Sequence, residues 1–310
     1  MSSGLIQRWA TETVPPNLPY PLVLRTPHAH PLLALFGVSL GVLSFMVVAP
    51  LVMLLLAGLY WALTGAAGDF EQTYRSLIAY ELPFGLVVGH LGLVTLIPIS
   101  AALVLLLHRV RPGYLSSVLG RLRWRWFGLS LVIGAACLMV ILVAQNLTAA
   151  DGPNWDLRPQ SNWWVFLAFM VLTTPLQAAA EEYFFRGYLM QALGSLVSAP
   201  WFGIVTSAAM FTLFHNSLNP ALIVDRFAFG VLAGVLVWAT GGLEAAIAAH
   251  VVNNVASFTL GALTSSMAEI KAVTEVTWVA AGWDVARFAL FVVVIWWVAR
   301  RVDVARLTPA

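Results

Sequence analysis

The chain has 310 residues, of which 60% are hydrophobic and only 10% carry a charge, with a net charge of +2. A soluble domain has about 25% charged residues, so these charges are too few to cover a water-facing surface, and the mean hydropathy of +0.86 agrees. The composition excludes an ordinary soluble domain. The small net charge gives no reason to expect a nucleic-acid partner, and a single cysteine excludes a disulfide within the chain.

Long, continuous apolar segments run along the whole chain. Such segments favour transmembrane helices over the alternating pattern of a barrel. Because every backbone amide in hydrocarbon must be paired internally, we predict an all-α polytopic helix bundle of about eight spans in the cell membrane. The spans are expected near residues 32–64, 82–107, 127–149, 163–192, 199–218, 227–241, 243–266 and 284–299.

The distribution of arginines predicts the orientation of the bundle. Residues 1–30 are expected to form a proline-containing tail, residues 31–300 the bundle and residues 301–310 a second tail. Arginines cluster in residues 109–125, after the second span, and in residues 300–306, after the eighth. Because cytoplasmic loops are enriched in Lys and Arg, we predict that both termini are cytoplasmic. The loops 65–81 and 150–162 would then face outward, with their acidic residues Asp69, Glu71, Asp151 and Asp156.

Charged side chains interrupt the fourth span, where ionisable groups are functional candidates. Glu181, Glu182 and Arg186 are followed by another mostly apolar stretch, so we expect them inside the helix rather than at a solvated helix end, which is the alternative. Glu182 and Arg186 stand four residues apart, in the order that favours an ion pair. Glu181 has no partner nearby in the sequence, and a desolvated carboxylate is a good proton acceptor, as a general base requires.

Two later spans contain further polar residues. His215 lies late in the fifth span, and His250 and Asn254, four residues apart, share one face of the seventh. Taken singly, each site is also compatible with hydrogen bonding between helices. At a rise of about 1.5 Å per residue, the expected depths of Glu181, His215 and His250 allow them to meet at one level of the membrane. We predict that they line a cavity open toward the cytoplasmic side.

These residues, with Phe211, complete three motifs in order on separate helices. The motifs are Glu181-Glu182-x-x-x-Arg186, Phe211-x-x-x-His215 and His250-x-x-x-Asn254. With them the sequence resembles the CAAX protease and bacteriocin-processing (CPBP) family of intramembrane proteases, which includes the Ras-converting CAAX endopeptidases. The resemblance covers about residues 165–262, which would form the catalytic core.

This resemblance implies an endopeptidase that acts on a membrane-associated peptide or protein. It leaves the substrate undetermined among prenylated C-terminal tails, bacteriocin leader peptides and anchored regulatory proteins. The implied roles are a water-activating base for Glu181, an orienting ion pair for Glu182 and Arg186, water or charge stabilisation for His215, oxyanion binding for His250 and Asn254, and packing for Phe211.

The cofactor is left open between none and a single divalent metal such as zinc. Zinc peptidases often use two histidines, one glutamate and a water, and Glu181, His215 and His250 would be those ligands here. The sequence lacks H-E-x-x-H, in which both histidines share one helix. Glutamate chemistry without a metal is therefore favoured over a metalloprotease.

A non-enzymatic transporter or a binding or immunity protein on the same scaffold is the competing interpretation. Ionisable residues in spans also mark transport paths, although the sequence shows no matching halves of the kind that many transporters have.

Five charged residues outside the motifs are expected to have structural or gating roles. We expect Glu244 to supply charge at a helix N-terminus. Asp225 and Arg226 are expected in the loop before the sixth span, and Asp284 and Arg287 at the interfacial start of the eighth.

Overall fold

The computed structural model describes residues 8–148 and 157–310, and within these ranges every regular element is a helix, as predicted. Asp151 and Asp156 of the predicted outer loop lie outside the described residues. The elements are η1 (Tyr20–Leu22), α2 (Pro31–Leu63), α3 (Phe70–Ile78), α4 (Phe84–Val94), α5 (Leu96–Ala102), η2 (Leu103–Leu107), η3 (Pro112–Leu115), α6 (Trp124–Thr148), α7 (Trp163–Glu182), η4 (Tyr183–Leu189), α8 (Met190–Gly194), α9 (Pro200–Phe214), α10 (Pro220–Thr240), α11 (Glu244–Thr264), α12 (Met267–Ala272) and α13 (Trp278–Arg301).

Seven helical stretches of the described chain are long and apolar enough to cross a membrane. The α4–η2 segment forms one of them and the α7–α8 segment another. Helix α9 is also apolar but, with 15 residues, is shorter than these seven; counted with them, it makes the eight apolar helical stretches expected from the sequence. Many large apolar side chains of α2, such as Leu32, Leu55 and Leu63, face outward, as lipid contact requires. The chain is thus a multi-pass membrane protein.

Two helices begin earlier than the hydropathy pattern predicted. Helix α10 begins at Pro220 because the Asn219 side chain accepts a hydrogen bond from the Leu222 amide at 2.9 Å and caps its first turn. Thr277 caps α13 in the same way. The predicted positions of Asp225 and Arg226 in a loop, and of Asp284 and Arg287 at a helix start, are therefore wrong: all four lie inside helices.

The fourth crossing is one continuous helical segment with an irregular centre. Between α7 and α8, the residues Tyr183–Leu189 form a π-helical stretch. A π-helix pairs each amide with the carbonyl five residues earlier, so it changes the direction of the side chains that follow, and it occurs frequently at functional sites. The sequence predicted an uninterrupted α-helix here and did not reveal this change.

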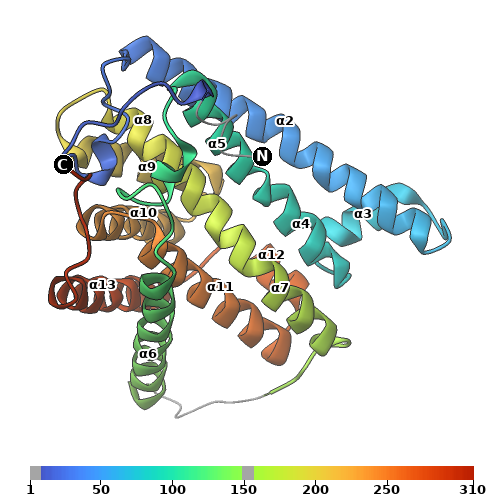
Figure 1. Cartoon of the computed structure of the whole chain (residues 1–310). Coiled ribbons are helices and arrows are strands. Elements are labelled where there is room, and N and C mark those ends of the chain that lie inside the picture. Colours follow the sequence, from blue (N-terminus) through green and yellow to red (C-terminus); the bar gives the residue numbers. More distant parts are fainter. Residues whose placement is uncertain (1–7, 149–156) are drawn as a thin grey trace.

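The N-terminal segment from residue 8 onward, the C-terminal segment and the basic loop after η2 lie at one end of the bundle (Figure 1). The amide of Leu18 donates to Thr308 Oγ1 at 2.9 Å, and the amide of Thr308 donates to the Leu18 carbonyl at 3.0 Å. Glu12 of the N-terminal segment also bonds to the Arg109 carbonyl. We call this end, formed by residues 8–30, 108–123, 241–243 and 302–310, the terminal end.

A buried ion pair joins these segments. Arg123 holds the Glu244 carboxylate with Nε at 2.8 Å and Nη2 at 2.7 Å, and its Nη1 donates to the Ala305 carbonyl at 2.9 Å. Glu244 is the first residue of α11 and is fully buried. It therefore stands at a helix N-terminus as predicted, but the structure adds that it fixes the basic loop and the C-terminal segment to α11.

Candidate functional site

The innermost part of the site is the predicted ion pair between Glu182 and Arg186. Arg186 Nη1 lies 2.9 Å from Glu182 Oε1, and both side chains are fully buried. The rings of Phe211 and Phe229 cover the guanidinium, with centroids 4.2 and 5.0 Å from its central carbon. The two charges thus compensate each other in a dry environment, as buried charges require.

Glu182 also orients the side chain of His250. His250 Nδ1 lies 2.8 Å from Glu182 Oε1, the same oxygen that Arg186 contacts. A carboxylate can only accept hydrogen bonds, so Nδ1 carries the proton, and Nε2 is the nitrogen left for the reaction. His250 Nε2 lies 3.6 Å from Glu181 Oε2. The fourth and seventh crossings therefore meet at Glu181, Glu182 and His250.

Gln177 joins the remaining polar groups and was missed in the sequence. Its Nε2 donates to Glu181 Oε1 at 2.7 Å, and its Oε1 accepts from Asn254 Nδ2 at 3.0 Å. The expectation that Glu181 has no partner nearby in the sequence is therefore wrong. The available signal was a glutamine in an apolar helix, four residues before Glu181 and thus on the same face.

His215 is held at the end of the short helix α9. Its Nδ1 lies 2.8 Å from the carbonyl oxygen of Phe211, one turn earlier, and its Nε2 has no hydrogen-bond partner among the described residues. The His215 ring also packs on the Phe211 ring, with centroids 4.3 Å apart. Phe211 packs, as expected, and in addition orients His215 and covers the guanidinium of Arg186.

These groups surround one cavity of about 510 Å³. The cavity is lined by Glu181, His215, His250 and Asn254. Glu182 and Arg186 lie behind these side chains and are linked to the cavity wall through His250. The structure therefore brings all six predicted site residues into one cluster. The residues of this cluster that face the cavity are Gln177, Glu181, His215, His250 and Asn254.

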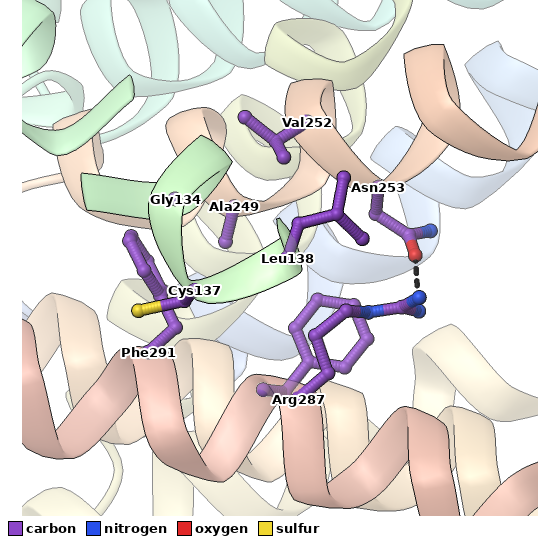
Figure 2. Close-up of a pocket in the computed structure, with 9 residues that line it drawn as sticks. Gly134, Cys137, Leu138, Ala249, Val252, Asn253, Arg287 and Phe291 are labelled. Atoms are coloured by element: carbon purple, nitrogen blue, oxygen red, sulfur yellow. Dashed lines mark hydrogen bonds between the residues drawn. The ribbon is translucent and has the colours of Figure 1, made fainter. Parts of the chain in front are cut away.

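The cavity continues past charged side chains that the sequence placed outside the site. Asp225, Arg226 and Arg287 all contribute to its wall. Arg287 donates to Asp284 Oδ1 at 2.8 Å and to Asn253 Oδ1 at 2.6 Å. Figure 2 shows the second of these bonds, beside a small pocket of about 20 Å³ that is lined mainly by apolar side chains of α6, α11 and α13. Arg287 thus fixes the residue next to Asn254.

The cavity and the terminal end lie at opposite ends of the bundle. Arg226 lies near the start of α10 and Arg287 is nearer the start of α13 than its end, whereas both helices finish at the terminal end. Lys271 of α12 lies in the connection between α11 and α13, also far from that end. The predictions that the termini are cytoplasmic and that the cavity opens to the cytoplasm therefore cannot both hold.

The candidate metal ligands do not form a ligand set. Within residues 8–148 and 157–310, no group of three or more His, Cys, Asp or Glu side chains is arranged to hold a metal ion. Glu181, His215 and His250 share the cavity, and His250 Nε2 lies 3.6 Å from Glu181 Oε2, but the three do not form such a group.

Comparison with known proteins identifies one family. Residues 160–256 match the family described as type II CAAX prenyl endopeptidase Rce1-like, and this range contains all three motifs. The resemblance to CAAX proteases predicted from the motifs is thereby confirmed. The uncharacterized protein YyaK of Bacillus subtilis (strain 168) is 32% identical over 141 residues, which make up 43% of this chain and 47% of YyaK. The chain thus matches about half the length of this relative. No solved structure matches the chain.

Proposed function

From the match of residues 160–256 to the Rce1-like endopeptidases, we propose that the chain is an intramembrane endopeptidase with Glu181 as its general base. The observation that carries this proposal is the convergence of Glu181, His215, His250 and Asn254 on one cavity. Hydrolysis of a peptide bond needs water, a base and an oxyanion site together, and a cavity of this size with polar side chains in its wall, inside an apolar bundle, supplies a place for them.

Glu181 is the group that takes the proton from water. A water between Glu181 and the carbonyl carbon of the substrate transfers one proton to the carboxylate as its oxygen attacks that carbon. The resulting tetrahedral intermediate carries a negative charge on the former carbonyl oxygen. Glu181 then delivers the proton to the amide nitrogen, the C–N bond breaks, and a carboxylic acid and an amine leave. The hydrogen bond from Gln177, at 2.7 Å, fixes the direction of Glu181 during both transfers.

Asn254 and the histidines stabilise charge and hold water. The Asn254 amide uses one N–H on Gln177, and its second N–H is the donor available to the oxyanion. Removing a single oxyanion donor costs about 10²–10³-fold in kcat in other hydrolases. His215 and His250 each have Nδ1 occupied, so Nε2 of each ring is the atom that can hold the attacking water.

Glu182 and Arg186 act through His250 and do not touch the substrate. Glu182 fixes the ring orientation of His250, and Arg186 compensates the charge of Glu182. This division separates a catalytic layer at the cavity wall from a positioning layer behind it.

The test is a comparison of N-terminal proteomes from membranes that contain the parent or Glu181→Gln. We expect neo-N-termini that depend on Glu181, and a loss of about 10²–10⁴-fold in the cleavage rate of the corresponding purified substrate, the range that a general base contributes. Glu181→Gln keeps the size and the hydrogen bond to Gln177, so the variant should retain the Tm of the parent. Equal cleavage by both proteins would rule out the proposed function.

A further inference from the structure

The charge distribution of the two ends gives the cavity a direction across the membrane. Ten of the sixteen Lys and Arg residues lie at the terminal end or in the first or last turn of a helix that meets it. Three lie in the connections at the opposite end, and three are within the site or its cavity wall. The ten are Arg8, Arg25, Arg109, Arg111, Arg121, Arg123, Arg125, Arg300, Arg301 and Arg306.

Acidic residues have the opposite distribution. The connections at the other end carry more carboxylates than cations, within short segments that join α2 to α4 and α11 to α13. The bias of Lys and Arg in short loops orients membrane proteins with the basic side toward the cytoplasm. The terminal end is therefore the cytoplasmic end. The carboxylates in these connections are Asp69, Glu71, Glu81, Glu269 and Glu275.

The short helix α9 leaves space at the end of the bundle opposite the terminal end. It has 15 residues and a length of about 22 Å, short of the roughly 30 Å hydrocarbon thickness. Since α9 begins at the cytoplasmic end, His215 at its far end stays inside the membrane and leaves room beyond it. None of the residues found in the cavity wall comes from the described parts of the terminal end.

We infer that the catalytic cavity opens to the extracytoplasmic side, and that the enzyme takes peptide segments that lie on the outer surface of the membrane. This inference rests on the proposed function for its substrate class and on the charge distribution for its direction. It replaces the expectation of a cytoplasmic opening, which was based on depths estimated along single helices.

The chemistry of the opening suits a hydrated polypeptide. Asp225 Oδ1 and Arg226 Nε are buried without a hydrogen-bond partner, and neither side chain is in an ion pair within 4 Å among the described residues. Lys271 adds a third cation to the wall, beside Arg226 and Arg287. Half-buried charges of both signs disfavour a lipid chain and can pair with the amides and charged groups of a peptide.

Cysteine accessibility tests the direction without knowledge of a substrate. The only cysteine, Cys137, is buried, so Cys137→Ala provides a background for single cysteines. Leu218→Cys, at a position 92% exposed between α9 and α10, and Glu275→Cys report on the cavity side. Val302→Cys, 53% exposed, and Asp303→Cys are the matched controls at the terminal end.

Intact cells are treated with a membrane-impermeant maleimide before and after permeabilisation. We expect residues 218 and 275 to react in intact cells and residues 302 and 303 to react only after permeabilisation. Reaction of 302 and 303 in intact cells, or a requirement for permeabilisation at both 218 and 275, would overturn the inference.

A pair of single-span reporters separates this inference from the proposed function. Both carry the same Glu181-dependent cleavage segment, one on the outer and one on the cytoplasmic face. Cleavage of the outer reporter alone is the expected result. Cleavage of the cytoplasmic reporter alone would support the peptidase and reject the proposed direction of the cavity. If the cysteines are labelled as expected but neither reporter is cleaved in a Glu181-dependent way, the peptidase is rejected and the direction is kept.

Discussion

Replacement of Gln177 by leucine removes the link between the proposed base and the proposed oxyanion donor. The leucine is similar in size but keeps neither the 2.7 Å bond to Glu181 nor the 3.0 Å bond to Asn254. Glu181 and Asn254 both remain, so any effect on catalysis comes from their orientation.

The expected magnitude follows from the lost bonds. A hydrogen bond to a charged group contributes about 1.5–3 kcal/mol, and about 1.4 kcal/mol changes a rate tenfold. If this contribution is made mainly in the transition state, kcat falls by about 10–100-fold from the Glu181 bond, and the loosened Asn254 adds to the loss. KM should change little, because Gln177 lies beside the reacting groups rather than along the charged part of the cavity wall.

The assay is single-turnover cleavage of a Glu181-dependent substrate in detergent or liposomes, with Tm measured in parallel. Gln191→Leu is the matched control, because Gln191 is also a buried glutamine of the same crossing but donates to the Tyr114 carbonyl at 3.0 Å, outside the cavity wall. The control should cleave like the parent per folded molecule. Normal kcat in Gln177→Leu, at a Tm equal to that of the parent, would refute the proposed coupling of base and oxyanion donor.

Three further predictions concern charge, metal and pH. Arg186→Met leaves Glu182 buried without its cation and should reduce the free energy of unfolding by about 3–5 kcal/mol. The Tm should fall, and a second substitution, Glu182→Gln, should partly restore it. An unchanged Tm in Arg186→Met would contradict the stabilising ion pair. Dialysis against a chelator should leave cleavage unchanged, and stoichiometric zinc whose removal abolishes cleavage would refute the glutamate mechanism. Burial lowers the pKa of His108, just past the second crossing, to about 4. As the pH falls, His108 is therefore protonated in the unfolded state before it is protonated in the folded state. The stability that the neutral His108 contributes is fully present above about pH 6.5 and declines as the pH falls toward 4. The Tm of the parent should fall more than that of His108→Phe between pH 7.5 and 5.

The sequence by itself determined the fold class and the local relations within helices. Too few charges for a water-facing surface and long apolar runs leave a helical bundle as the solution in hydrocarbon. The spacing of four residues placed Glu182 beside Arg186, and His250 and Asn254 on one face, because a helix turns through about 3.6 residues. These relations are confirmed by the contacts within the site. The limits of α10 and α13 were missed because capping by Asn219 and Thr277 is a local side-chain event that hydropathy does not register.

Only the tertiary structure decided which helices meet and at which end of the bundle the cavity lies. Gln177 contacts Asn254 across 77 positions of sequence, and Glu182 contacts His250 across 68, distances at which no periodicity carries information. The proposed direction of the cavity rests on a short α9 and on the common position of the N-terminal segment from residue 8, the C-terminal segment and the basic loop, which are properties of the assembled bundle. Depth estimated along single helices could not give that direction, because a side chain is placed across the membrane by the tilt and packing of all its neighbours.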